Sequence, residues 1–190
     1  MWAGKTVDAI RSSRTRALLP RLACLPGVLA VLCSASAATA DPPSEAAVKA
    51  AFVYNFAKFV EWPANLSAAN AMTLCVSGTR PELAASLTGL VGKSVQGHVL
   101  AVKNNVNAAD LNTCHVLFVG NDARLLAGQA RGRAGLLTVS DMPGFAQSGG
   151  IIGLFSEGDR IRFEINPRSA EAAGLKVSSQ LMKLAKVVEE

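Results

Sequence analysis

The chain has 190 residues, 50% of them hydrophobic, and carries 19 basic against 14 acidic residues. Five of the basic residues and one of the acidic residues lie in the first forty positions, so the remainder has a formal net charge of about +1. This near balance argues against nucleic acid as a partner, and the remaining 150 or so residues suit one domain with a full core.

The first forty residues have the composition of an export signal. Basic residues precede an apolar stretch, Leu25 to Ala37, that is too short for a permanent membrane span. Ala38-Thr39-Ala40 follows as a cleavage site, so we expect residues 1–40 to be a cleaved signal peptide and 41–190 to be a periplasmic domain. A lipoprotein anchored at Cys33 is the alternative, but Leu32 is too large for the position before a lipid-attached cysteine.

Two cysteines, Cys75 and Cys114, remain beyond the signal. An exported chain folds in an oxidising compartment, where a disulfide persists. Both cysteines lie in or beside apolar, strand-like segments, and a bridge closing so long a loop would stabilise the chain by roughly 3–4 kcal/mol. We expect a Cys75–Cys114 disulfide, with two buried free thiols as the alternative.

The first element after the signal is predicted to be an amphipathic helix. Ser44 is a suitable N-cap, and apolar residues recur at three- to four-residue spacing up to about Val60. Trp62-Pro63 predicts the end of this helix, because proline lacks the N–H that a helix needs. The apolar face predicted to pack on the core is Val48, Phe52, Phe56 and Phe59.

Short strands and helices then alternate. The predicted strands are 72–77, 98–103, 115–120, 136–140, 150–155 and 160–166, and the predicted helices are 81–89, 122–131, 167–174 and 178–188. In the last strand, Arg160, Arg162 and Glu164 alternate with apolar residues, as in a hairpin strand with one solvent-facing side. The expected fold is therefore α/β: a single compact domain with a mixed central sheet of about five to six strands flanked by helices, ending in a hairpin and a C-terminal helix.

The sequence offers little material for catalysis. Both histidines, His98 and His115, lie in predicted strands beside apolar residues, where a structural role is more usual than a catalytic one. Ser140-Asp141 ends a predicted strand, where α/β folds place active residues, so a hydrolase site there is one alternative. No G-x-S-x-G motif, C-x-x-C pair or calcium loop occurs. We expect no enzymatic activity, no metal and no cofactor.

Five segments are specific in combination. In chain order they are AAFVYNFAKFVEWP, CHVLFVG, GLLTVSDMPGFAQSGGIIGLF, RIRFEIN and AGLKVSSQLMKLAKVV. Together they resemble the YfiR family of periplasmic proteins over nearly all of the chain after the signal. The Cys75–Cys114 spacing is also similar to a pair in that family. Some members have a second cysteine pair near the later strands; this chain has none there, so a redox switch through that pair does not carry over.

The resemblance implies a noncatalytic regulator. The best-known members bind and repress the periplasmic sensor part of an inner-membrane diguanylate cyclase, which lowers cyclic di-GMP and restrains biofilm formation. They are dimeric, and an OmpA-like outer-membrane lipoprotein relieves the repression by sequestering them. Another membrane sensor protein is the alternative for the controlled partner.

Such a regulator needs a contact surface, which we predict in the hairpin, the C-terminal segment and the loop after residue 140. Hairpin pairing and helix capping are the structural explanation for the same residues. A periplasmic sensor that binds a small molecule near Asp141 and Phe145, and feeds another membrane signalling protein, is the functional alternative. The predicted partner-binding residues are Glu164, Asn166, Ser179, Gln180, Pro143 and Phe145.

Overall fold

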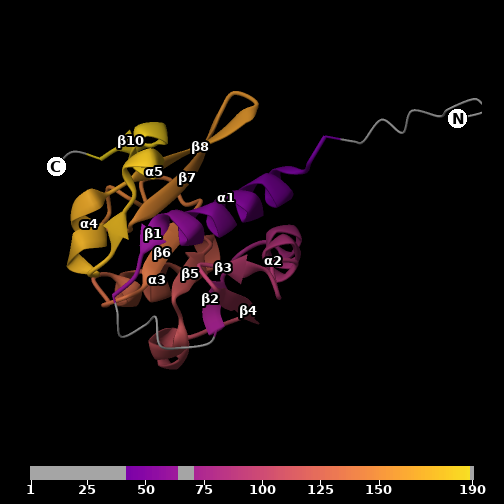
Figure 1. Ribbon diagram of the computed structural model, residues 1–190. Coiled ribbons are helices and arrows are strands. Elements are labelled where there is room, and N and C mark those ends of the chain that lie inside the picture. The colour runs from indigo at the N-terminus through magenta and orange to yellow at the C-terminus, as the bar shows by residue number, and fades with distance from the viewer. Residues whose placement is uncertain (1–41, 64–70, 189–190) are drawn as a thin grey trace, which may run out of the picture. The chain divides into compact units, whose positions relative to one another are not determined.

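The computed structural model describes residues 42–63 and 71–188, which belong to one structural unit (Figure 1). The predicted export signal and its cleavage at Ala40 lie outside these residues. The helices are α1 (Glu45–Phe59), α2 (Pro81–Thr88), α3 (Arg124–Ala130), α4 (Pro167–Ala172) and α5 (Ser179–Leu184), with 3₁₀ segments η1 (Ala108–Thr113) and η2 (Asn121–Ala123). The strands are β1 (Val60–Glu61), β2 (Ala71–Ser77), β3 (Ser94–Val95), β4 (His98–Asn104), β5 (Val116–Val119), β6 (Leu137–Ser140), β7 (Ile152–Glu157), β8 (Arg160–Ile165), β9 (Lys176–Val177) and β10 (Lys186–Val187).

Local sequence signals set the starts of several helices. The side chains of Ser44, Asn166 and Ser178 accept hydrogen bonds from backbone N–H groups in the first turns of α1, α4 and α5. These bonds satisfy N–H groups that have no partner inside the helix. Proline at the start of α2 and of α4 lacks an N–H that would otherwise be free.

The central sheet is mixed and has eight strands in the order β10-β8-β7-β6-β5-β2-β4-β3. Neighbouring pairs from β4 through β2, β5 and β6 to β7 are parallel, whereas β7 and β8 form the antiparallel hairpin. The mixed α/β fold is thus confirmed, but the predicted number of five to six strands is wrong. β3 and β10 were missed because each has only two residues, too few to show an alternating pattern.

The C-terminal segment also differs from the prediction. The last helix, α5, ends at Leu184 instead of continuing to residue 188. Lys186 and Val187 instead pair in parallel with Glu164 and Ile165 of β8 as strand β10. Leu184, the last residue of α5, is 72% exposed.

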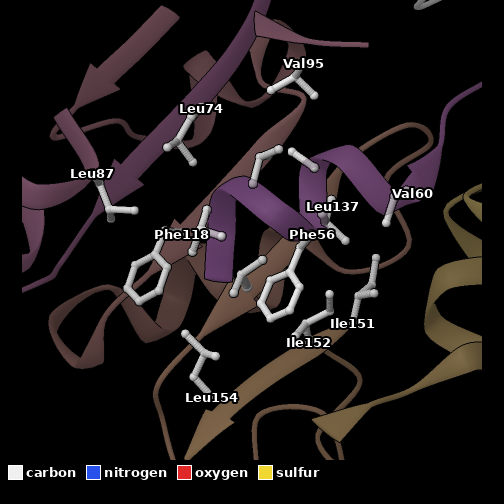
Figure 2. Close-up of a cluster of buried hydrophobic side chains, with 14 of the residues drawn as sticks. Phe56, Val60, Leu74, Leu87, Val95, Phe118, Leu137, Ile151, Ile152 and Leu154 are labelled. Atoms are coloured by element: carbon white, nitrogen blue, oxygen red, sulfur yellow. The ribbon is translucent and has the colours of Figure 1, made fainter. Parts of the chain in front are cut away.

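Helix α1 runs along one face of the sheet (Figure 1). Phe56 is fully buried there and lies among Leu137, Ile151 and Ile152 in the close-up of Figure 2. The buried face of α1 is rotated relative to the predicted one, since Phe59 is 38% exposed while Lys49 is buried. The residues that α1 buries are Lys49, Ala50, Val53, Phe56 and Ala57.

The opposite face of the sheet is covered by α3, η1 and the loop after β6. A second cluster of buried side chains there includes Leu117, Leu126 and Phe145. The predicted disulfide is present in the same cluster: Cys75 of β2 is bonded to Cys114, with 5.7 Å between their Cα atoms.

Candidate functional site at the carboxyl edge of the sheet

The parallel strands β2, β5 and β6 end at the same edge of the sheet, where Ser77, Val119 and Ser140 lie in register. In open α/β sheets, ligands bind outside the carboxyl ends of the strands. Between β2 and β5 this edge is closed, because the loops that follow pack backbone to backbone: a Cβ added to Gly120 would overlap the carbonyl oxygen of Gly78. The chemistry-bearing side chains therefore gather after β6.

Ser140 ends β6 and is completely buried. Its hydroxyl donates a hydrogen bond to the carbonyl oxygen of Val119 and accepts one from the backbone N–H of Met142 at 3.0 Å. These bonds tie the start of the loop to the neighbouring strand. A hydroxyl held in this way is not available as a nucleophile, so the hydrolase alternative at Ser140-Asp141 loses its central group.

Asp141, the next residue, pairs with a lysine that sequence reasoning missed. The ammonium of Lys49 lies 2.7 Å from Asp141 Oδ2 and 2.7 Å from Glu45 Oε1, and the Lys49 side chain is only 7% exposed. Burial alone would lower the pKa of Lys49, but hydrogen bonds to Asp141 and Glu45 outweigh it and raise that pKa. The hydrogen bond from Lys49 also lowers the pKa of Glu45. Lys49 thus clamps α1 to the loop after β6.

The loop from Asp141 to Gly150 folds back on itself beside the hairpin. The ring of Phe145 lies directly over Gly150, where an added Cβ would overlap it, and Gly150 N–H donates to the carbonyl oxygen of Phe145 at 2.9 Å. Gln147 donates to Glu164 Oε2 at 2.7 Å, and Asn166 donates to the carbonyl oxygen of Ala146 at 2.9 Å. Glu164 of β8 and Asn166, which follows that strand, therefore hold the loop in place.

The structure separates the predicted partner-binding residues into two groups. Pro143, Phe145, Glu164 and Asn166 come together at the loop, but Phe145, Glu164 and Asn166 are 6%, 7% and 2% exposed, leaving Pro143 as the exposed member. The exposure expected for Glu164 on a solvent-facing side of the hairpin strand is wrong, because the loop covers it through Gln147.

The other two predicted residues, Ser179 and Gln180, are exposed in the first turn of α5. This helix packs through Leu181 into the core cluster on the α1 side of the sheet. Its position is fixed by a hydrogen bond of 3.0 Å from Ser178 N–H to the carbonyl oxygen of Phe59. The loop and α5 therefore belong to opposite faces of the sheet.

His115 has the structural role expected of a strand histidine. Its Nδ1 accepts a hydrogen bond of 3.0 Å from the backbone N–H of Thr73, and its ring makes an edge contact with Trp62. Burial, and to a lesser degree the charge of His98, lower the pKa of His115. The imidazole is thus held as a neutral acceptor.

Several cavities lie around these elements. One of about 350 Å³, between the starts of α1 and α2, is lined by Glu45, Lys49, Arg80 and Glu82. A smaller one of about 110 Å³ lies between α3 and the loop after β6, with Arg124, Arg131 and Phe145 in its wall. The small cavity is in the region where a sensor pocket was predicted, near Phe145.

No cluster of three or more metal-ligating side chains occurs among residues 42–63 and 71–188. No helix in those two segments combines the length and the apolar character that a membrane span requires.

Comparison with known proteins gives one family match for this chain. A family described as YfiR/HmsC-like matches residues 46–186. A solved structure of a conserved domain protein from Vibrio cholerae O1 biovar El Tor is similar, with 13% sequence identity and a TM-score of 0.45. That similarity covers 77% of this chain and 60% of the other, so the chain spans about 60% of the length of that protein. No curated protein matches the chain.

Proposed function

Because the chain belongs to the YfiR/HmsC-like family, we propose that it is a periplasmic regulator that binds and represses the periplasmic sensor part of an inner-membrane diguanylate cyclase. Family membership implies a regulator of diguanylate cyclase signalling and not an enzyme. Repression of the cyclase would lower cyclic di-GMP and biofilm formation.

The family match over residues 46–186 is the observation that carries this proposal, because it extends from the first turns of α1 to β10. The site after β6 supports it. There Ser140 and Asp141 are engaged in hydrogen bonds and an ion pair that position a loop. Such a site serves to present a surface.

Repression requires a difference in affinity. A protein that binds two conformations of the cyclase equally leaves their equilibrium unchanged, whereas stronger binding to the inactive conformation shifts it. A rigid surface suits this task, because little conformational entropy is then lost on binding. The loop after β6 has this quality, since hydrogen bonds connect it to Lys49 of α1, to Glu164 of β8 and to Asn166 just after β8.

The proposed contact surface has two parts. Pro143 is the exposed contact on the loop, while Phe145, Glu164 and Asn166 act through the loop by holding its shape. Ser179 and Gln180 form the second part, at the start of α5. We propose that the two parts contact different partners. One partner is a second copy of this chain in a homodimer, and the other is the sensor part of the cyclase.

The remaining details follow the family resemblance. The chain is exported with cleavage near Ala40, and an OmpA-like outer-membrane lipoprotein competes for the repressor. Another membrane sensor protein could take the place of the cyclase, because the binding surface itself does not specify the enzymatic part of its partner.

Membrane capture tests the proposal. The tagged protein is expressed in its own cells, cross-linked, and recovered with its membrane partners, and a diguanylate cyclase is the expected capture. Deleting the chain should raise cyclic di-GMP. Recovery of no cyclase, together with unchanged cyclic di-GMP in the deletion strain, would reject the function.

Two exposed substitutions sharpen this test. Pro143→Arg and Gln180→Arg each add a long charged side chain to a proposed contact and should restore high cyclic di-GMP without lowering the melting temperature. Gln129→Arg on the exposed side of α3 is the matched control and should repress normally. If all three variants repress the cyclase equally, neither Pro143 nor Gln180 belongs to the contact surface.

A further inference from the structure

The small cavity between α3 and the loop after β6 has a distinctive charge. Its volume is about 110 Å³, and its wall includes Arg124, Arg131 and the hydroxyl-bearing Ser148. The apolar part of the wall consists of Ala127, Met142, Pro143 and Phe145, and all of these except Pro143 belong to the buried cluster on this face of the sheet. No acidic side chain lines the cavity.

The two arginines are placed on the same side of α3. They are seven residues apart, which corresponds to two helical turns and about 10.5 Å along the axis. Arg124 begins the helix, and Arg131 follows its last residue. The stem of Arg131 passes over Gly149, where an added Cβ would lie 3.4 Å from Arg131 Cδ. Both guanidinium groups therefore border the same space between α3 and the loop.

Neither guanidinium group has a carboxylate partner within the described parts of the chain. The ion pairs Lys49–Glu45, Lys49–Asp141 and Arg162–Glu157 involve other cations. Arg124 donates one hydrogen bond of 3.1 Å to Asn121 Oδ1, which leaves most of its N–H groups free. Two positive charges thus face a cavity with no negative charge to balance them.

The larger cavity at the starts of α1 and α2 differs in this respect. Its cations, Lys49 and Arg80, are accompanied by the carboxylates of Glu45 and Glu82, and Lys49 is already paired. An anion entering it would meet like charges. The larger cavity therefore lacks the charge imbalance of the cavity beside α3.

We propose that the cavity beside α3 binds a small oxyanion, the carboxylate or phosphoryl group of a metabolite. Guanidinium groups present N–H donors in a planar fork that matches the paired oxygens of both groups. The Ser148 hydroxyl can donate one more bond, and Phe145 adds apolar surface to the wall. The volume restricts the bound part to a few heavy atoms.

Binding would join α3 to the loop that carries Pro143. An oxyanion held between them restricts the loop, so affinity for the oxyanion and affinity for the partner become linked. This consequence rests on the proposed function. Oxyanion binding itself is a property of the isolated protein and can be measured without any partner.

The experiment is a titration of the ¹⁵N-labelled, purified protein followed by NMR. Sodium phosphate and sodium acetate are the two probes, with sodium chloride at matched ionic strength as the salt control. Saturable shifts are expected at the amides of Ser148 and Gly149, with a dissociation constant of about 1 mM or below. Saturation by phosphate alone identifies a phosphoryl group, and saturation by acetate identifies a carboxylate.

Matched variants locate the site. Arg124→Gln and Arg131→Gln should each weaken binding at least about tenfold, because each removes charge-assisted hydrogen bonds. Arg160→Gln, the same change of charge at the exposed end of the hairpin, should bind as the parent does. Melting temperatures without ligand should agree among all three. Shifts with phosphate and acetate no larger than those with chloride would overturn the proposal. So would Arg124→Gln and Arg131→Gln variants that bind the oxyanion as tightly as the parent does.

Discussion

Lys49 is the residue that most clearly connects the fold to the candidate site. An ammonium group taken out of water costs several kcal/mol unless it is paired and hydrogen-bonded. Lys49 meets this cost with two carboxylates, one of which, Asp141, comes from the loop that the proposed function uses. The two carboxylates differ in exposure, 52% for the side chain of Glu45 and 17% for that of Asp141, and their contributions should differ accordingly.

The Asp141→Asn variant should lower the free energy of unfolding by about 2 kcal/mol, because it removes the charge that compensates the buried ammonium. Glu45→Gln should lower it by no more than about 0.5 kcal/mol, since a pair with a solvent-exposed partner contributes little. Chemical denaturation of the purified variants measures both. Equal losses in the two variants would show that burial does not distinguish the two pairs.

His115 makes stability depend on pH. The lowered pKa means that the folded state binds a proton less readily than the unfolded chain, whose histidine titrates near 6.5. In the pH range between the folded pKa and 6.5, the unfolded chain therefore holds more protons, and stability falls as the pH falls. Protonation of Nδ1 would also break the hydrogen bond from Thr73 N–H.

The measurement is the free energy of unfolding from pH 7.5 down to pH 5.5, with an expected decrease on acidification. His115→Asn retains an acceptor near Nδ1 but does not titrate, so its stability should vary less over this range. His98→Asn, at the start of β4, removes only the smaller cause of the lowered pKa of His115, so most of the parent's slope should remain. A slope that persists unchanged in His115→Asn would assign the pH dependence to other groups.

At the scale of elements, long periodic segments were predictable and short paired ones were not. α1, β2, β5 and the β7–β8 hairpin were placed within a few residues, because each has a cap, a turn or an apolar run of its own. β1, β9 and β10 consist of two residues each and exist because of their partners: Val60 pairs with Val177, and Val187 with Ile165. Pairing of this kind is a tertiary effect that no local pattern contains.

The candidate site was predictable to a similar extent. The Asp-Met-Pro-Gly sequence after a strand indicated the loop, and Phe145 and Pro143 are part of it. Lys49 was missed because a lysine between apolar helix positions is usually assigned to the solvent side, although its spacing from Phe52 and Phe56 also fits the buried face. Arg124 and Arg131 were missed because charged residues on a short helix are typical of any exposed surface.

Two glycines provide a matched test of how elements approach one another. Gly120→Ala should destabilise the protein by about 3 kcal/mol, because its Cβ would overlap the backbone of Gly78 and push apart the loops after β2 and β5. Gly128→Ala in α3 should stabilise it by about 0.5–1 kcal/mol, because open space surrounds that position and alanine favours helix. Thermal unfolding compares the two, and a neutral Gly120→Ala would contradict the close packing of these loops.

On the scale of the whole molecule, the two faces of the sheet have different tasks. The α1 side holds the larger core cluster, in which Phe56 and Phe118 are fully buried (Figure 2). The opposite side holds the smaller cluster together with the disulfide, the loop after β6 and the arginine-lined cavity. The smaller cluster thus carries the loop part of the proposed contact surface and a covalent link.

The disulfide should therefore matter more for the smaller cluster than for the fold in general. Cys75 and Cys114 are 39 residues apart, and closing a loop of this length is expected to contribute about 4 kcal/mol by restricting the unfolded chain. The double variant Cys75→Ala/Cys114→Ala should lose about this amount, and reductant should lower the melting temperature of the parent but not of the variant. Because α1 and its core do not contain the bridge, amide hydrogen exchange in the variant should accelerate first in η1 and α3 and only later in α1. Uniform acceleration across both faces would show instead that the sheet unfolds as one cooperative unit and that the bridge stabilises it as a whole.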